Sequence, residues 1–180
     1  MSDIIFKGKA IKLGDNISTD HIIPGRFAHL RSNLPELAKH ALEDADPTFI
    51  SRVKPGDFLV AGKNFGLGSS REHAPVVIKM AGISAILVES TARIFFRNAI
   101  NQGVPVLLCD TTKISDGDKL EIDLAHSTVA NLASGTRLTC SKVSPLMSAI
   151  LSEGGLIPYI QKHKNFVIKK NSGEEPRGGD

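Results

Sequence analysis

Short apolar runs and segments of helical periodicity alternate along the chain as far as Asp110. Residues 4–13 alternate partly between apolar and polar positions and end at a Gly-Asp-Asn turn, which predicts a first strand. Three later runs are apolar except for Glu89, as expected of strands buried on both faces: residues 58–62, 85–89 and 104–108. Helices are predicted between them, over residues 71–80 and 91–101. This order indicates an α/β fold with a parallel or mixed sheet covered by helices.

The flanking segments predict further elements. Asn33 as an N-cap and Pro35 in a first turn predict a helix over residues 34–44. After Asp110 the pattern changes to a period of two, which is typical of half-exposed antiparallel strands. These strands are expected over residues 119–124 and 136–140, and a short helix over residues 145–151.

Length and composition are those of one globular domain. The chain has 180 residues, of which 41% are apolar, and we expect a single domain over residues 1–170. Residues 171–180 are polar and rich in glycine, which predicts a disordered tail. The net charge of +3 comes without a dense basic block, so nucleic-acid binding is not expected. No apolar run is long enough for a membrane span and no secretory signal is recognisable, so we expect a cytoplasmic protein.

Candidate metal ligands are few. Cys109 and Cys140 are far apart in sequence, and a disulfide between them is not expected in a reducing compartment. His21 and His73 lack metal-ligand spacing, and a structural role is the favoured interpretation for both. We therefore predict no metal site built by this chain.

The most informative stretch is the glycine-rich segment of residues 62–75. Gly66 and Gly68 allow sharp turns and a close approach of backbone to a ligand. Ser69, Ser70 and Arg71 follow where a helix is predicted to begin, a place that attracts carboxylate or phosphate. A serine hydroxyl among donors and a guanidinium can take part in proton transfer, because its alkoxide is stabilised there. The alternative is a plain helix cap, since serine is a favoured N-cap residue.

Other motifs that use glycine-rich loops are absent. The segment has no Gly-Lys-Ser/Thr ending of a P-loop and no Gly-x-Gly-x-x-Gly of a dinucleotide fold. The Gly-x-Ser-x-Gly elbow of the α/β-hydrolases is also missing.

Three segments together resemble the swivelling domain of aconitase-type hydro-lyases, as found in the separate small subunits of isopropylmalate dehydratase and homoaconitase. They are Gly-Asp-Asn-Ile-Ser-Thr-Asp-His-Ile-Ile-Pro-Gly-Arg-Phe at residues 14–27, the segment at residues 62–75, and Ala-Arg-Ile-Phe-Phe-Arg-Asn-Ala-Ile-Asn-Gln-Gly-Val-Pro at residues 92–105. The resemblance runs from about residue 3 to residue 163. It implies a three-layer β/β/α swivel domain with a barrel-like mixed sheet.

The resemblance also implies residue roles. Ser69 corresponds to the catalytic base, while Ser70 and Arg71 support the oxyanion and bind carboxylate. Asp20 is expected to orient a partner in the active site, with a loop-cap role as the alternative. Leu67 departs from many relatives, which have cysteine there, and this change is not expected to abolish activity.

The implied reaction removes water from a hydroxy di- or tricarboxylate and adds it back, with a [4Fe–4S] cluster taking up the substrate hydroxyl. A cluster needs several thiolates, which Cys109 and Cys140 do not supply. The cluster is therefore expected on a large partner subunit, in a heterodimer or heterotetramer, and the isolated chain is expected to be inactive.

Substrate choice is expected in the loop of residues 27–33. The resemblance implies that Leu30, Arg31 and Ser32 contact the substrate, and His21 is a further candidate contact. The alternative for Arg31 is an outward-pointing surface arginine. An arginine there suits a third carboxylate, as in homoaconitase, whereas separate small subunits most often belong to 3-isopropylmalate dehydratases of leucine synthesis. Isopropylmalate is the first expectation, and homoaconitate or a dimethylmalate is the alternative. A non-catalytic carboxylate-binding module and a pure assembly subunit are the competing classes.

Overall fold

A seven-stranded mixed sheet forms the centre of the computed structural model, which describes residues 5–164. Its strands are β1 (Ile5–Lys12), β2 (Phe58–Val60), β3 (Ala85–Val88), β4 (Val106–Leu108), β5 (Lys119–Asp123), β6 (Thr128–Asn131) and β7 (Arg137–Thr139). Across the sheet they follow the order β4-β3-β2-β1-β5-β6-β7. The strands from β1 to β4 pair in parallel, and those from β5 to β7 pair antiparallel, with β5 beside β1. The predicted mixed sheet is confirmed.

Short helices connect the strands. They are α1 (Thr19–Ile22), α2 (Leu34–Ala38), α3 (Phe49–Arg52), α4 (His73–Met80), α5 (Arg93–Asn101), α6 (Pro145–Ser152) and α7 (Leu156–His163). Two 3-10 helices are η1 (Gly25–Ser32) and η2 (Thr111–Lys113). Within residues 5–164, no helix is both long and apolar enough to cross a membrane.

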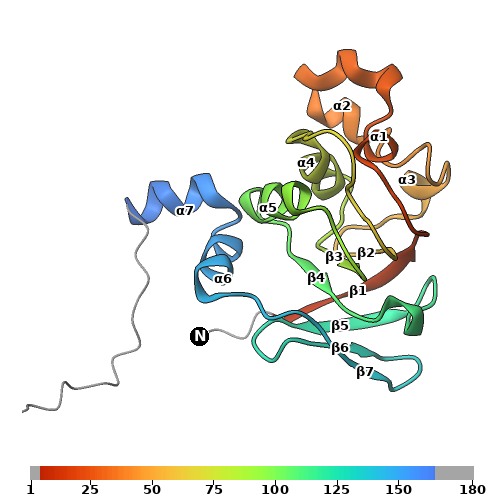
Figure 1. Cartoon of the computed structure of the whole chain (residues 1–180), viewed down its shortest axis with the longest axis vertical. Helices are drawn as coiled ribbons and strands as arrows, with labels where there is room; N and C mark the ends of the chain where they lie inside the picture. Colours follow the sequence, from red (N-terminus) through yellow and green to blue (C-terminus); the bar gives the residue numbers. More distant parts are fainter. Residues whose placement is uncertain (1–4, 165–180) are drawn as a thin grey trace, which may run out of the picture.

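Two apolar cores lie on opposite faces of the parallel strands. Leu59 of β2 belongs to the core that β1 to β4 share with α1 to α4, whereas its neighbours Phe58 and Val60 belong to the core shared with β5 to β7. Figure 1 shows the same division, with α1 to α4 above the parallel strands and β5 to β7 below them. Helices, parallel strands and antiparallel strands are thus stacked in three layers, which confirms the β/β/α prediction.

The sheet curls until its two edges meet at one end. The Ser141 N–H donates to the carbonyl of Leu108 at 2.8 Å, and the Leu108 N–H donates to Ser141 Oγ at 3.0 Å. No ladder joins β4 to β7 in the described part of the chain, so the barrel is nearly closed. The barrel-like sheet implied by the family resemblance is confirmed.

The helix predicted over residues 34–44 is wrong beyond Ala38, where α2 ends. Leu42 takes a left-handed conformation with φ 59°, and its N–H donates to the carbonyl of Ile22 at 3.1 Å. Its side chain is fully buried in the core. Tertiary contact therefore overrides the helical periodicity. β6 and α7 were not predicted, and the tail expected over residues 171–180 lies outside the described residues.

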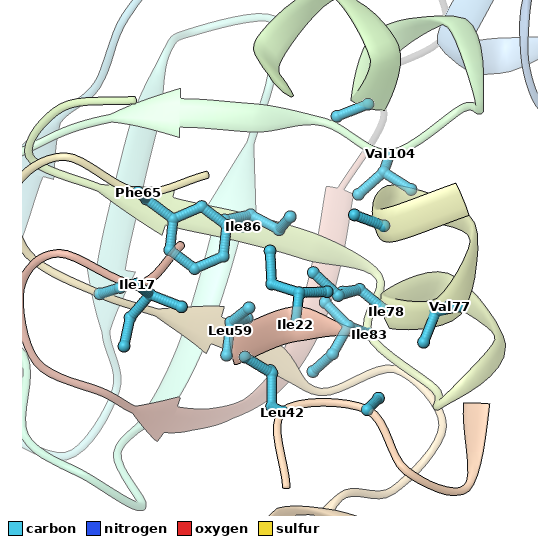
Figure 2. Packing of buried hydrophobic residues seen from close by; sticks show 14 of the residues in the cluster. Ile17, Ile22, Leu42, Leu59, Phe65, Val77, Ile78, Ile83, Ile86 and Val104 are labelled. Carbon is cyan, nitrogen blue, oxygen red and sulfur yellow. The ribbon is translucent and has the colours of Figure 1, made fainter. Parts of the chain in front are cut away.

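The core fixes α1 against the sheet, although α1 is a single turn. Ile22 is 0% exposed, and Figure 2 shows it among Leu59, Ile78 and Ile83. The Ser18 side chain caps the helix by accepting a hydrogen bond from the His21 N–H. Thr19 and Asp20 therefore sit on a well-anchored element.

Candidate active site

The three motifs of the sequence meet where β1, β2 and β3 end. The segment after β2 lies between the segments after β1 and β3, through parallel bridges from Leu67 to Ser18 and from Phe65 to Thr91. The Gly66 N–H donates to the carbonyl of Ile17 at 2.7 Å, which strengthens the first of these connections. In sheets of parallel strands, the carboxyl ends are where ligands bind. The fold thus brings the predicted loop to the expected edge.

Glycine is required at two positions of this loop. Gly66 has φ 72°, and a Cβ atom there would lie 2.8 Å or less from three atoms of the Phe95 side chain. Gly68 has φ 103°, and a Cβ atom there would lie 3.3 Å from Thr19 Oγ1. Both positions therefore combine a left-handed backbone with close packing. At Gly66 the close neighbour is the core residue Phe95, so the absence of a side chain here lets the loop pack directly against the core.

The two serines do not cap a helix. α4 begins at His73, with Glu72 as an N-cap that makes no side-chain capping bond, so the helix start predicted at residue 71 is wrong. The Arg71 carbonyl instead accepts a bond from the Ala74 N–H at 3.0 Å, which forms a turn ahead of the helix. Ser69 and Ser70 are exposed, and their hydroxyl groups bond no other residue of the described chain. The plain helix-cap interpretation therefore has no support in the geometry.

Arg71 is held by α1. Its Nη1 donates to the carbonyl of Ile23 at 2.6 Å, and its Nη2 forms an ion pair with Asp20. The Arg71 side chain is 18% exposed and that of Asp20 is 64% exposed. The pair thus lies at the surface, with the guanidinium on its inner side. Asp20 was predicted to orient a partner in the active site, and the side chain that it contacts in the structure is that of Arg71.

A cavity of about 360 Å³ opens beside the serines. Its lining comes from Thr19, Gly66, Gly68, Ser69, Ser70, Arg71, Ala92, Arg93, Ile94, Phe95 and Asn98. Ala92 is the N-cap of α5 and provides no side-chain capping bond, so the first N–H groups of α5 lack an intrahelical partner. Arg93 is exposed, and its guanidinium has no ion pair with any residue from 5 to 164. A free cation and free N–H groups therefore face the cavity from α5, and the sequence alone did not single them out as substrate contacts.

The predicted specificity residues lie apart from this cavity. Leu30 packs on the core from η1, and Arg31 and Ser32 are exposed on the same 3-10 helix. His21 uses Nδ1 to accept a hydrogen bond from the Ser18 N–H at 3.0 Å, as part of the cap of α1. Ser69, Ser70 and Arg71 therefore line the cavity, and Asp20 joins them through its ion pair with Arg71 from outside the lining. The other four candidates also lie outside the lining.

The cysteines are placed for packing. Cys140 is buried and Cys109 half-buried beside the seam between the sheet edges, and neither lines the cavity. Burial raises the pKa of Cys109 to about 12 and that of Cys140 to about 11, so both remain thiols at neutral pH. Across residues 5–164, no group of three or more His, Cys, Asp or Glu side chains is arranged to hold a metal ion. These two thiols do not fit the ligand set of an iron–sulfur cluster.

Comparison with known proteins agrees with the geometry. Residues 40–110, which include Ser69 to Arg71 and Arg93, match the aconitase C-terminal domain. The 3-isopropylmalate dehydratase small subunit 2 of Archaeoglobus fulgidus is 57% identical over 161 residues, covering 89% of this chain and 98% of that protein. The chain belongs to the aconitase family, among the 3-isopropylmalate dehydratase small subunits. The prediction of a hydro-lyase subunit is thereby confirmed.

Further members of this family show the same correspondence. The small subunit 1 of Thermotoga maritima is 53% identical and covers 90% of this chain and 98% of its own length. The crystal structure of a 3-isopropylmalate dehydratase from Methanocaldococcus jannaschii is 44% identical, with a TM-score of 0.85 over 89% of this chain and 96% of that chain. The family fold therefore extends over most of the chain, and the swivel-domain expectation is confirmed.

Proposed function

We propose that this chain is the small subunit of a cytoplasmic two-subunit hydro-lyase that interconverts 2-isopropylmalate and 3-isopropylmalate. The observation that carries the proposal is the exposed Ser69 at the cavity. The same cavity is lined by Arg71, which is hydrogen-bonded to Ile23, and by the start of α5. The family relatives carry the name of this activity. One relative, from M. jannaschii, is named an isopropylmalate/citramalate isomerase small subunit, so citramalate is the second substrate to test.

Ser69 is the proposed proton acceptor. As an alkoxide, it takes the proton from the carbon next to a substrate carboxylate, and the C–H electron pair becomes the new C=C bond. The hydroxyl group leaves from the neighbouring carbon, and addition of water in the opposite sense gives the isomer. A serine normally holds its proton too tightly for this role, so donors and cations around the oxygen must stabilise the alkoxide. Ser70, Arg71 and the first N–H groups of α5 are the groups available at this cavity.

Arg93 is the proposed contact for a substrate carboxylate. Arg71 already donates to Asp20 and Ile23, whereas the Arg93 guanidinium is free within the described chain. A planar guanidinium offers paired donors to a carboxylate, and charge-assisted bonds of this kind are the stronger ones. Arg71 retains unused N–H groups and contributes from the loop after β2.

The [4Fe–4S] cluster is assigned to a large partner subunit. One buried and one half-buried thiol away from the cavity are unsuitable ligands, so this chain contributes proton transfer and carboxylate binding. The cluster supplies the Lewis acid that assists loss of the hydroxyl group. Ser69 is exposed at an open cavity, which is consistent with completion of the site by that subunit in a heterodimer or heterotetramer.

The test is anaerobic reconstitution with the large subunit encoded by the same genome, with iron and sulfide supplied. Turnover is measured on 2-isopropylmalate, citramalate, homocitrate and a dimethylmalate. We expect turnover by the complex, fastest on 2-isopropylmalate, and none by the chain alone. Turnover by the isolated chain would refute the two-subunit proposal. Binding of a carboxylate by the chain alone, with an inactive complex, would favour a binding module instead.

A substitution of Arg31 tests whether this residue takes part in substrate choice. If the large subunit folds over η1 so that Arg31 reaches a third carboxylate, Arg31→Val will lower the rate on homocitrate and spare 2-isopropylmalate. The geometry of this chain predicts the other result, because Arg31 lies outside the cavity lining. Unchanged rates on both substrates would remove Arg31 from the specificity loop.

A further inference from the structure

We propose that Thr19 is a positioning residue for Ser69, and that α1 holds the loop of residues 66–72 in place. This inference rests on the proposed function, because it concerns how the proton acceptor of that reaction is held. Thr19 is 2% exposed and lies at the back of the cavity. Its hydroxyl is therefore shielded from solvent and committed to a partner within the protein.

Thr19 makes two hydrogen bonds to the loop from one residue. Its N–H donates to the carbonyl of Leu67 at 2.9 Å, and its Oγ1 donates to the carbonyl of Ser69 at 3.0 Å. The two carbonyl groups lie on either side of Gly68, whose conformation at φ 103° is accessible chiefly to glycine. Glycine gives the loop this shape but leaves it conformationally free. The two bonds from Thr19 supply the restraint that the glycine lacks.

The other side of Ser69 is held from the same helix. Arg71 donates to the carbonyl of Ile23 at 2.6 Å and pairs with Asp20. Ser69 is thus bracketed by ties to α1 before and after it, and α1 is anchored in the core through Ile22. The Ser69 hydroxyl has no partner of its own within residues 5–164. The position of the Ser69 hydroxyl is therefore set by the Ser69 backbone, and that backbone is held by hydrogen bonds to α1 and its C-cap.

The hydroxyl of Thr19 can be separated from its shape. Valine has the same branched outline but no donor, so Thr19→Val keeps the packing next to Gly68 and loses the bond to the Ser69 carbonyl. Serine keeps the donor and loses only a methyl group, so Thr19→Ser is the matched control. If packing were the whole role of Thr19, the serine variant would be the more impaired of the two.

The test uses the full chain in complex with its large subunit. For Thr19→Val we expect kcat to fall on the order of 10- to 100-fold, because small displacements of a reacting group are costly. KM should stay within about threefold, since the carboxylate contacts are intact. With substrate deuterated at the carbon that loses its proton, the isotope effect on kcat should rise. Thr19→Ser should restore kcat to within about threefold of the original value.

Two results would overturn the inference. One is a Thr19→Val complex with the original kcat and isotope effect, and the other is equal impairment of the valine and serine variants. Failure of the proposed function looks different, because then the original complex itself shows no turnover on any of the four acids. In that case hydrogen exchange of the full chain still decides the matter. Deuterium uptake over residues 66–72 should increase in Thr19→Val and not in Thr19→Ser. Unchanged uptake in Thr19→Val would refute the proposal that Thr19 restrains this loop.

Discussion

Gly66→Ala tests most sharply whether the loop before Ser69 packs against Phe95 as the structure shows. Alanine at this φ of 72° costs about 1–2 kcal/mol from the left-handed backbone alone. The added Cβ would lie 2.8 Å or less from three atoms of the buried Phe95 side chain. Overpacking of this kind costs about 1–3 kcal/mol, so the total loss of unfolding free energy should be about 2–5 kcal/mol.

Gly135→Ala is the matched control, because Gly135 has φ 73° and nothing within 4 Å of an added Cβ. It should lose only the backbone contribution of about 1–2 kcal/mol. Urea unfolding followed by far-UV circular dichroism measures both variants, since the chain has one tyrosine and no tryptophan. We expect Gly66→Ala to be the less stable by about 1–3 kcal/mol. Equal stability of the two variants would refute the packing of Gly66 against Phe95.

Three further predictions concern the site and the cysteines. Arg93→Gln should raise KM about 10- to 100-fold through loss of a charged hydrogen bond, while Arg97→Gln, one turn along α5 and outside the cavity, should not. Asp20→Asn should lower kcat but change the unfolding free energy by less than about 1 kcal/mol, because the ion pair is at the surface. Equal KM values in the two arginine variants, or an unaffected kcat in Asp20→Asn, would contradict these roles. Since burial raises the pKa of Cys109 to about 12 and that of Cys140 to about 11, iodoacetamide at pH 8 should label both at least about 100-fold more slowly than a free thiol. Rapid labelling of the native chain, read by mass spectrometry, would show that the thiols are not buried.

The parallel half of the sheet could be predicted from the sequence because its strands are continuously apolar. Leu59, with Phe58 and Val60 on the opposite face, shows why, since both faces of β2 are covered and no polar alternation is needed. The loop of Ser69, Ser70 and Arg71 was located from its glycines and its motif. The family resemblance placed Asp20 at the same site without naming its partner, and no local pattern records that the ends of β1 and β2 are adjacent.

Other features depend on contacts that no local pattern encodes. The two edges of the sheet meet at Leu108 and Ser141, which are distant in sequence and have no unusual composition around them. α2 ends before Leu42 because this residue takes a left-handed backbone conformation and buries its side chain in the core. Arg93 was not selected as a substrate contact, since a cation at a helix start resembles any surface residue until the cavity beside it is seen. Within residues 5–164 no acidic side chain pairs with Arg93, and this depends on the fold and not on the local sequence.

In the proposed mechanism the Ser69 alkoxide accepts the substrate proton, and turnover requires the complex of this chain with its large subunit. The most direct measurement is kcat of the reconstituted complex with Ser69→Ala, beside a control complex with Ser115→Ala at an exposed position outside the cavity. We expect Ser69→Ala to lose on the order of 100- to 10,000-fold in kcat, and Ser115→Ala to keep its rate. If the Ser69→Ala complex isomerises 2-isopropylmalate as fast as the original complex, Ser69 is not the proton acceptor.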